Sequence, residues 1–522
     1  MLSSFKISSS NQILFMDLYY HIVYFSAPKR FQRGRHHPYR NQDLSHTRGS
    51  RQQTLSHTGG EFNLKTHILK IIVTDLQTPR LVEEVGFHHF MKALNPSTDA
   101  ALSASAIRQE LVNMYDITKR EVKNAVSNAR DPVLSAELWI SSKEESYLTV
   151  TCHFIDKWEL KSYTLDTAQL LDNHTAENVH QQLQRISTEW EIMEKIKVVV
   201  VNVDGMKKIK LNLTWRYIPC FSHTLNKVIR EVIQSTDWRY LLRKCRQIVQ
   251  FFHQENGASR GYQLVQSSCV DWLPTLDMVK KICEQWPRFS KDSKYMHADH
   301  LWLNENERKL LENMKKALTV VKDVTEAIGT RGYVSVSNII PLLEKLQSSL
   351  QSLIKQENKV ALKLSEKCQY HFGSINQNMW FTVSTALDPR FKSSVLKTKQ
   401  AEKVKDKIRE EMSKLGSEAT SSSYNRKGLG EMGYEDSFLQ YVRERDISET
   451  QRPLQYWAAK NKSTVLAMVA HKYLSVISTA IPIEQMKHQD KSQIIFNRRK
   501  CLEVKDINMM LFLNGNHQNL TF

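Results

Sequence analysis

The spacing of apolar residues divides the chain into a helical start, a sheet-forming middle and a long helical remainder. Over residues 61–131 apolar positions recur every three or four residues, which predicts a small helical unit. After Pro132 the pattern changes, because residues 147–155 are rich in the β-branched and aromatic side chains typical of a strand. Residues 160–165 predict a second strand, so a sheet begins here.

Strand and helix patterns then alternate before the chain becomes almost wholly helical. A helix fits residues 175–190, and the run Val198–Val201 that follows suits a central strand buried on both faces. A short strand reaches Cys220 before a helix that starts near His223. From residue 238 to residue 358 the spacing is helical. This order indicates an α/β or α+β core followed by a helical region.

Two stretches show no sustained period. Residues 1–60 set basic side chains among serine, histidine, glutamine and glycine, which predicts a disordered basic tail. Such a tail could bind DNA phosphates or carry an import signal, and the alternative is a solvated leader or a mispredicted first exon. Residues 413–437 combine Ser421–Ser423 with several glycines and predict a flexible linker.

Charge and cysteine usage narrow the class of protein. The formal net charge of +18 and an isoelectric point near 9.4 favour nucleic acid as a partner, because basic side chains release counterions from phosphates; the alternative is a generically basic surface. The seven cysteines form no CxxC pair, which indicates a reducing compartment. The apolar residues 13–27, interrupted by Asp17 and His21, suit neither a signal peptide nor a membrane span. We expect a nuclear or cytoplasmic protein with no membrane partner.

Several blocks of sequence stand together in a recognisable order. One is Cys220-Phe-Ser-His-Thr-Leu-Asn226, followed at a distance by Trp272. The others are Glu137–Trp139, Ser146–Ile155, His174–Val179, Glu189–Trp190, Tyr333–Pro341, Ala386–Lys392, Pro453–Trp457, Lys472–Leu474, Pro482–Glu484 and Leu502–Asn516. Together they resemble the hAT superfamily of cut-and-paste DNA transposases, especially the domesticated vertebrate proteins with a BED zinc finger, over residues 62–516.

This resemblance implies a fold and a domain plan. The fold is α/β: a ribonuclease-H-like mixed sheet that starts in residues 132–236, is interrupted by an all-helical insertion in residues 237–412, and is completed by residues 438–522. In the family the last segment also mediates dimerisation, so a homodimer or a heterodimer with hAT relatives is expected. The apolar residues expected to serve dimerisation are Trp457, Tyr473, Leu474, Leu511, Phe512 and Leu513.

Strand transfer in these enzymes needs two divalent metal ions held by three converging carboxylates. At the first family position this chain carries Glu137 in place of aspartate. At the second position stands Val201, which cannot ligate a metal, and Asp204 lies three residues further on, an odd offset that points to the opposite face of a strand. Glu484 matches the third position within an otherwise altered motif. The resemblance therefore implies a broken catalytic triad, with no metal bound.

The sequence offers two candidate zinc sites, and each has too few ligands. Cys220 and His223 lack the second pair of ligands that a structural zinc site needs, so a buried thiol and a hydrogen-bonded core histidine are the favoured interpretation. No paired cysteines with a downstream HxxxH occur before residue 131, so the BED finger of the family is absent from these residues. Phosphate contacts are instead expected on one predicted helix, with a solvated helix face as the alternative: Arg239, Arg243, Lys244 and Arg246.

Three hypotheses follow. The first is a domesticated, catalytically inactive nuclear protein that dimerises, binds DNA and regulates transcription. The second is a residual nuclease or transposase that uses Glu137, Asp204 and Glu484 with a divalent metal such as Mg²⁺, and it requires these carboxylates to converge. The third is a protein-interaction scaffold, to which the resemblance adds the SUMO-ligase-like role described for some relatives.

Overall fold

The computed structural model describes most of the chain after residue 63. The described ranges are 64–94, 103–171, 175–206, 215–255, 272–291, 301–330, 335–421, 431–460, 464–480 and 497–517. They fall into two compact units, one containing residues up to Ile72 together with Thr78–Glu110, and the other containing Val73–Gln77 together with Leu111–Phe522. The predicted basic tail, residues 1–60, lies outside the described residues.

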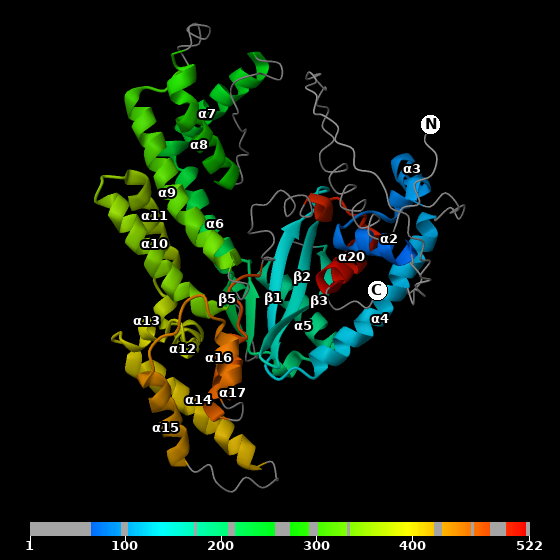
Figure 1. Ribbon diagram of the computed structural model, residues 1–522, viewed down its shortest axis with the longest axis vertical. Coiled ribbons are helices and arrows are strands. Elements are labelled where there is room, and N and C mark those ends of the chain that lie inside the picture. The colour runs from blue at the N-terminus through cyan, green and yellow to red at the C-terminus, as the bar shows by residue number, and fades with distance from the viewer. Residues whose placement is uncertain are drawn as a thin grey trace, which may run out of the picture. The chain divides into compact units, whose positions relative to one another are not determined.

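The centre of the larger unit is a mixed five-stranded sheet with the strand order β3-β2-β1-β4-β5 (Figure 1). Strands β1, β2 and β3 form an antiparallel meander, while β4 and β5 run parallel to β1. The strands are β1 (Val133–Ile140), β2 (Ser146–Asp156), β3 (Glu159–Leu170), β4 (Val198–Val201) and β5 (Arg216–Pro219). The mixed α/β class predicted from the sequence is confirmed.

Helices make up most of the remaining described chain. Early helices are α2 (Leu64–Thr74), α3 (Val85–Leu94), α4 (Ala104–Ser127) and α5 (Ala176–Glu189), with short 3-10 turns at Pro79–Glu83 and Met193–Lys195. After β5 come α6 (Phe221–Ile233), α7 (Thr236–Glu255), α8 (Trp272–Phe289), α9 (Glu305–Thr330), α10 (Ile339–Ile354), α11 (Lys359–Phe372), α12 (Met379–Leu387), α13 (Lys392–Leu396) and α14 (Ala401–Ser421). The last are α15 (Glu431–Arg443), α16 (Pro453–Ala459), α17 (Val465–Leu474) and α20 (Val504–Asn516).

The two faces of the sheet pack against different helices. Val198, Val200 and Ile218 point to the face whose core is shared with α6 and the helices that follow it. On the opposite face Tyr217 lies within hydrogen-bond distance of His180 in α5, at 2.5 Å. Alternation along each strand therefore buries β4 on both sides, as its run of four valines predicts.

Helix α20 covers the outer edge of the sheet. It lies along β3 (Figure 1), which is an edge strand. The side chain of Asn508 accepts a hydrogen bond from the Thr167 backbone N–H at 3.0 Å, and Asn516 donates one to the Thr164 carbonyl at 2.9 Å. These two bonds satisfy backbone groups that an open edge would expose to another strand, so α20 protects the sheet from edge-to-edge pairing.

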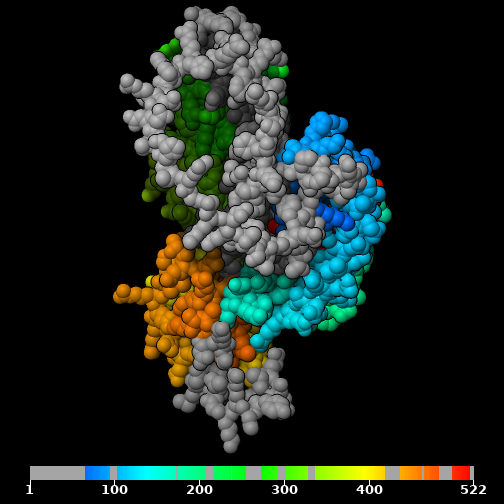
Figure 2. Space-filling model, turned by 45° about the vertical axis from the view of Figure 1, so that its right-hand side comes forward, coloured from blue at the N-terminus to red at the C-terminus, as the bar shows by residue number. Residues whose placement is uncertain are grey.

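The β2–β3 hairpin is fixed by the C-terminal part of the chain. Its two turn residues, Lys157 and Trp158, both have positive φ, at 48° and 64°, the backbone of a tight two-residue hairpin. His471 of α17 donates through Nε2 to the Ile155 carbonyl at 2.9 Å, and its ring meets Trp158 edge to face. Figure 2 shows the orange helices α16 and α17 beside this teal hairpin.

Both ends of the predicted flexible linker are helical, which corrects that prediction. Helix α14 continues through Ser421 and α15 begins at Glu431, so only residues 422–430 of the expected linker lie outside the described chain. The reason is tertiary contact: Arg409 of α14 pairs with Glu435 of α15 at 2.9 Å, and Phe438 is fully buried. Burial of an amphipathic face stabilises a helix more than glycine weakens it.

Candidate functional site

Glu137, the residue expected at the first acid position, forms a buried ion pair. Glu137 lies in the middle of β1 with 5% of its surface exposed. A guanidinium nitrogen of Arg499 donates to its Oε2 at 2.8 Å, and both side chains are more than nine-tenths buried. The carboxylate that the resemblance assigns to metal binding is therefore neutralised by a cation of the same chain.

The surroundings hold Arg499 firmly in this position. Its guanidinium lies 4.1 Å from the centre of the Trp139 ring, two residues along the same face of β1. It also donates to the Thr149 hydroxyl at 3.3 Å, and the Trp139 indole N–H donates to the same oxygen at 3.0 Å. The ring of Trp139 stacks in turn on Tyr147. Stacking and paired hydrogen bonds are the contacts that arginine makes best, so the site is built for a guanidinium.

The second acid position, Val201, offers no metal ligand. Val201 ends β4 with 2% of its surface exposed and pairs with Ala136 of β1. Residues paired across parallel strands point to the same face and neighbours in a strand to opposite faces, so Val201 points away from the Glu137 side. The next residue, Asn202, uses its amide to bond the Leu138 N–H at 2.7 Å and the Leu138 carbonyl at 2.9 Å. Its polar groups are thus used to extend the sheet.

Asp204 does not replace the missing acid. Its side chain is 77% exposed and pairs with Lys227 of α6 at 2.7 Å, and this hydrogen bond lowers the pKa of Asp204. Each described acid of the expected triad thus has its own basic partner. Within the described ranges, no group of three or more His, Cys, Asp and Glu side chains is arranged to hold a metal ion. Glu484 lies outside the described residues. The described groups do not fit a two-metal centre.

The cysteine of the CxxH block, which precedes α6, contacts the residues that follow α17. Cys220 is completely buried, and its backbone N–H donates to the Val201 carbonyl at 2.7 Å. Its sulfur accepts a hydrogen bond from the Ala480 N–H at 3.3 Å and lies 3.3 Å from the Thr479 hydroxyl. The expected buried thiol is where the sequence predicts it, and its contacts are structural.

The histidine of the block differs from its prediction as a core residue. His223 is half-buried in the first turn of α6, near the charges of Asp204 and Lys227. Burial lowers the pKa of His223 because it disfavours the imidazolium, while the charge of Asp204 opposes that shift. Its place on the helix explains the difference: the neighbouring positions Phe221, Ser222 and Leu225 face the core, and His223 is turned to the side.

The tryptophan after the block meets it directly. Trp272 opens α8, is 5% exposed, and donates from its indole N–H to the Asn226 side-chain oxygen at 2.8 Å. The block and its following tryptophan are therefore joined by one hydrogen bond between α6 and α8. Asn226 was not singled out in the sequence, although it is the last residue of the quoted block.

The four basic residues expected to contact phosphate divide into two groups on α7. Lys244 is half-buried and pairs with Glu307 of α9 at 2.8 Å, so its charge is already matched. Arg239 and Arg243 are exposed, and Arg246 is half-buried. Of the four, only Arg239 and Arg243 are exposed and have no ion-pair partner among the described residues.

The six residues expected at a dimer interface pack inside their own chain. Trp457 donates its indole N–H to the Leu387 carbonyl at 2.9 Å, and the Phe512 ring packs against Tyr115 and Trp190. Each of the six is less than one-tenth exposed: Trp457, Tyr473, Leu474, Leu511, Phe512 and Leu513. In this conformation they stabilise the fold and are covered by the chain itself.

Arg499 is the site residue that the sequence pattern did not reveal. It lies 362 positions from Glu137, so no local spacing links the two. The one available signal is the basic run Arg498-Arg499-Lys500 directly before an apolar helix, since a cation that close to a buried segment needs a partner.

Comparison with known proteins identifies one matching family model and several relatives. The family model described as the ZBED1 RNase-like domain matches residues 135–217, which include most of β1, all of β2, β3 and β4, and the first half of β5. Zinc finger BED domain-containing protein 4 of Homo sapiens is 22% identical over 80% of this chain. Putative AC transposase of Zea mays is 21% identical over 60% of this chain, and zinc finger BED domain-containing protein 6 of Homo sapiens is 20% identical over 63%.

The match covers only part of each relative. This chain spans 40%, 43% and 37% of the lengths of these three proteins, in the same order. Among the described helices, none has the length and apolarity to cross a bilayer. The matched domain, the two kinds of relative and the five-stranded mixed sheet agree: the chain contains an RNase-like domain and is similar to hAT transposases and to the zinc finger BED domain-containing proteins.

Proposed function

We propose that this protein is a catalytically inactive, transposase-derived DNA-binding protein. The observation that carries the proposal is the buried ion pair between Glu137 and Arg499 at the position of the first catalytic acid. An arginine stays protonated at any physiological pH, so the carboxylate cannot be released by a proton shift.

The energetics oppose exchange of Arg499 for a metal ion. Removing one partner of a buried ion pair costs about 3–5 kcal/mol, because the other charge is left uncompensated in a low dielectric. A metal arriving at Glu137 would displace the guanidinium and would find no second oxygen ligand at Val201. Since two-metal chemistry depends on several carboxylates at once, the site does not support phosphoryl transfer.

Charge supports the DNA-binding part. The chain carries a net charge of +18, and Arg239 and Arg243 of α7 are exposed. Basic side chains at phosphates give affinity that falls steeply with salt. Nuclear location, self-association and regulation of transcription complete the proposal; because the predicted interface residues are buried within one chain, a dimer would use other surfaces.

A DNA-cleavage assay tests the proposal. The full chain is incubated with supercoiled plasmid in Mg²⁺ or Mn²⁺, beside the Glu137→Gln variant, and the nicked product is measured. We expect no metal-dependent nicking above the level of Glu137→Gln. Nicking by the wild type that Glu137→Gln abolishes would overturn catalytic inactivity and favour the residual nuclease.

A further inference from the structure

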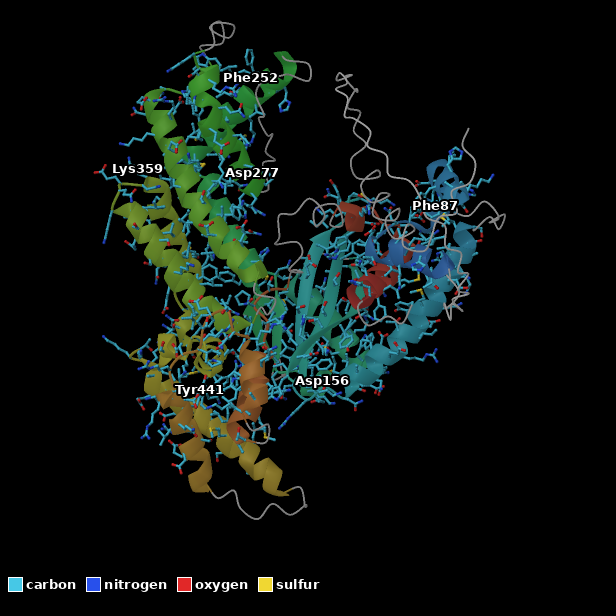
Figure 3. All side chains as sticks on the ribbon, in the orientation of Figure 1. Phe87, Asp156, Phe252, Asp277, Lys359 and Tyr441 are labelled. Atoms are coloured by element: carbon cyan, nitrogen blue, oxygen red, sulfur yellow. The ribbon has the colours of Figure 1, made fainter. Side chains whose placement is uncertain are left out.

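Helix α7 carries a run of basic residues between Asp237 near its start and Glu255 at its end. From Trp238 to Gln254 this helix contains four basic residues and His253, and no acidic residue. Its inner side is apolar and buried, ending near Phe252, which Figure 3 labels. The helix therefore presents a basic outer face on a rigid support.

An aromatic side chain stands among these charges. Tyr240 is 64% exposed, whereas its neighbour Trp238 is 3% exposed. Arg239 precedes it and Arg243 follows three positions later, so all three side chains lie within one turn. Within the described residues, Tyr240 has no ring partner and neither arginine has an ion-pair partner.

On two other helices, exposed charges and an exposed ring have neighbours of matching chemistry. On α14, Arg409 pairs with Asp406 and Lys407 pairs with Glu410. The 80% exposed Tyr370 on α11 lies beside Lys367, whose ammonium pairs with Glu231. These two helix faces mix basic and acidic side chains or pair with acids nearby, whereas Arg239 and Arg243 of α7 have no acidic partner among the described residues.

We propose that Arg239, Tyr240 and Arg243 form a binding site for a DNA strand with unpaired bases. The inference rests on the DNA binding proposed above and specifies its site and preferred form of DNA. The two guanidinium groups contact successive phosphates, and the phenol ring of Tyr240 stacks on an unpaired base. A protruding aromatic ring between cations is the arrangement that single-strand binding sites use, because every base offers a π-face but only an unstacked base exposes it.

Fluorescence anisotropy tests this site with the full chain and a labelled single-stranded 20-mer, beside its duplex. Tyr240→Leu should weaken single-strand binding by about 5- to 100-fold, and Tyr240→Phe should stay within about twofold of wild type, because the ring is kept. The matched control is Tyr370→Leu, at a tyrosine that is even more exposed, and it should change nothing. Because both tyrosines are exposed, the variants keep the fold, and circular dichroism checks this.

The salt dependence of binding tests the two arginines. Changing Arg239 and Arg243 together to glutamine should lower the slope of log affinity against log salt by about 1.4 for the single strand, about 0.7 for each phosphate that is no longer neutralised. Wild-type binding that Tyr240→Leu and the double variant leave unchanged would overturn the α7 site while DNA binding stands. No wild-type binding to either DNA form at low salt would overturn both proposals.

Discussion

The side chain of Arg499 determines whether Glu137 is available to bind a metal ion. It is held by Glu137, by the Thr149 hydroxyl and by the face of Trp139. Three different kinds of contact on one guanidinium fix its position in a way that a lysine ammonium could not reproduce. The position predicted to bind metal in the family is part of the structural core in this chain.

This arrangement predicts a strong energetic coupling between two residues far apart in sequence. Arg499→Met should lower the free energy of unfolding by about 3–5 kcal/mol, because it leaves Glu137 buried without a counter-charge. The double variant Glu137→Leu with Arg499→Met should recover most of that loss, since both charges are gone. Urea unfolding followed by circular dichroism measures these two variants and the single variant Glu137→Leu; additive effects would show that the two side chains do not interact.

A second residue-scale prediction concerns pH. Burial lowers the pKa of His153 to about 3, and its two ring nitrogens lie near the Ser135 and Ser162 hydroxyls, at 2.9 and 2.8 Å. In the unfolded chain the imidazole takes up a proton near pH 6.5, so its stabilising contribution is complete above that pH. It should be lost by about 1.4 kcal/mol per pH unit as the pH falls from 6.5 toward 3.

The test compares wild type with His153→Gln, which keeps a polar side chain but cannot titrate. Unfolding free energies at pH 7, 6, 5 and 4 should fall less steeply for the variant. Equal slopes for the two proteins would mean that His153 is protonated in the folded state.

At the scale of single residues, the resemblance assigns acid positions but says nothing of their partners. Glu137 and Val201 are assigned to these positions because their sequence blocks keep the family's order, and that assignment stays a prediction. The outcome at each acid depended on contacts from elsewhere, Arg499 for Glu137 and Lys227 for Asp204. Such partners are fixed by the tertiary fold, and no spacing rule in the sequence states them.

Among the elements, the contact between α20 and β3 is unusually close. Gly515 lies against Thr164, and a methyl group in place of its hydrogen would overlap the threonine side chain. Alanine favours a helix over glycine by up to about 1 kcal/mol, whereas forced overpacking costs about 1–3 kcal/mol. We expect Gly515→Ala to lower the free energy of unfolding.

A matched glycine provides the control. Gly86 in α3 has open space where its Cβ would lie, so Gly86→Ala should be neutral or stabilising. Thermal unfolding of the two variants separates overlap from helix propensity. If Gly515→Ala were as stable as Gly86→Ala, α20 would not pack against β3 as closely as its contacts indicate.

Strands β2, β3 and β4 were predicted from the sequence, whereas the surface that the C-terminal helix α20 packs against was not. Alternation and β-branched content predicted β2 and β3, and four valines predicted β4. The apolar run Leu511–Leu513 was expected to serve dimerisation, yet it is buried within the chain. Periodicity reports that a face is buried; it does not report whether the covering surface belongs to the same chain or to another.

For the whole molecule, the net charge of +18 predicts salt-dependent association with DNA. Sedimentation of the full chain with a short duplex should show a complex at about 50 mM salt that weakens by at least about tenfold by about 200 mM. The same experiment without DNA reports self-association. Sedimentation that the duplex does not alter at any salt concentration would argue against a DNA partner.

The overall architecture could be anticipated further than the boundaries of its parts. The pattern of strands between helical regions was sufficient for the α/β class, because periods of two and of 3.6 are distinct. The linker expected at residues 413–437 failed at both ends, where α14 and α15 are held by the Arg409–Glu435 pair and by burial of Phe438. Local composition predicts flexibility only where no tertiary contact overrides it.

The most direct test of the central claim is a titration of the purified chain with Mn²⁺, in which the free ion is followed by electron paramagnetic resonance. If Arg499 has taken the place of metal at Glu137, wild type and Glu137→Gln should bind Mn²⁺ identically, with no tight site that depends on the carboxylate. Tight binding of Mn²⁺ by the wild type that Glu137→Gln removes would contradict the account.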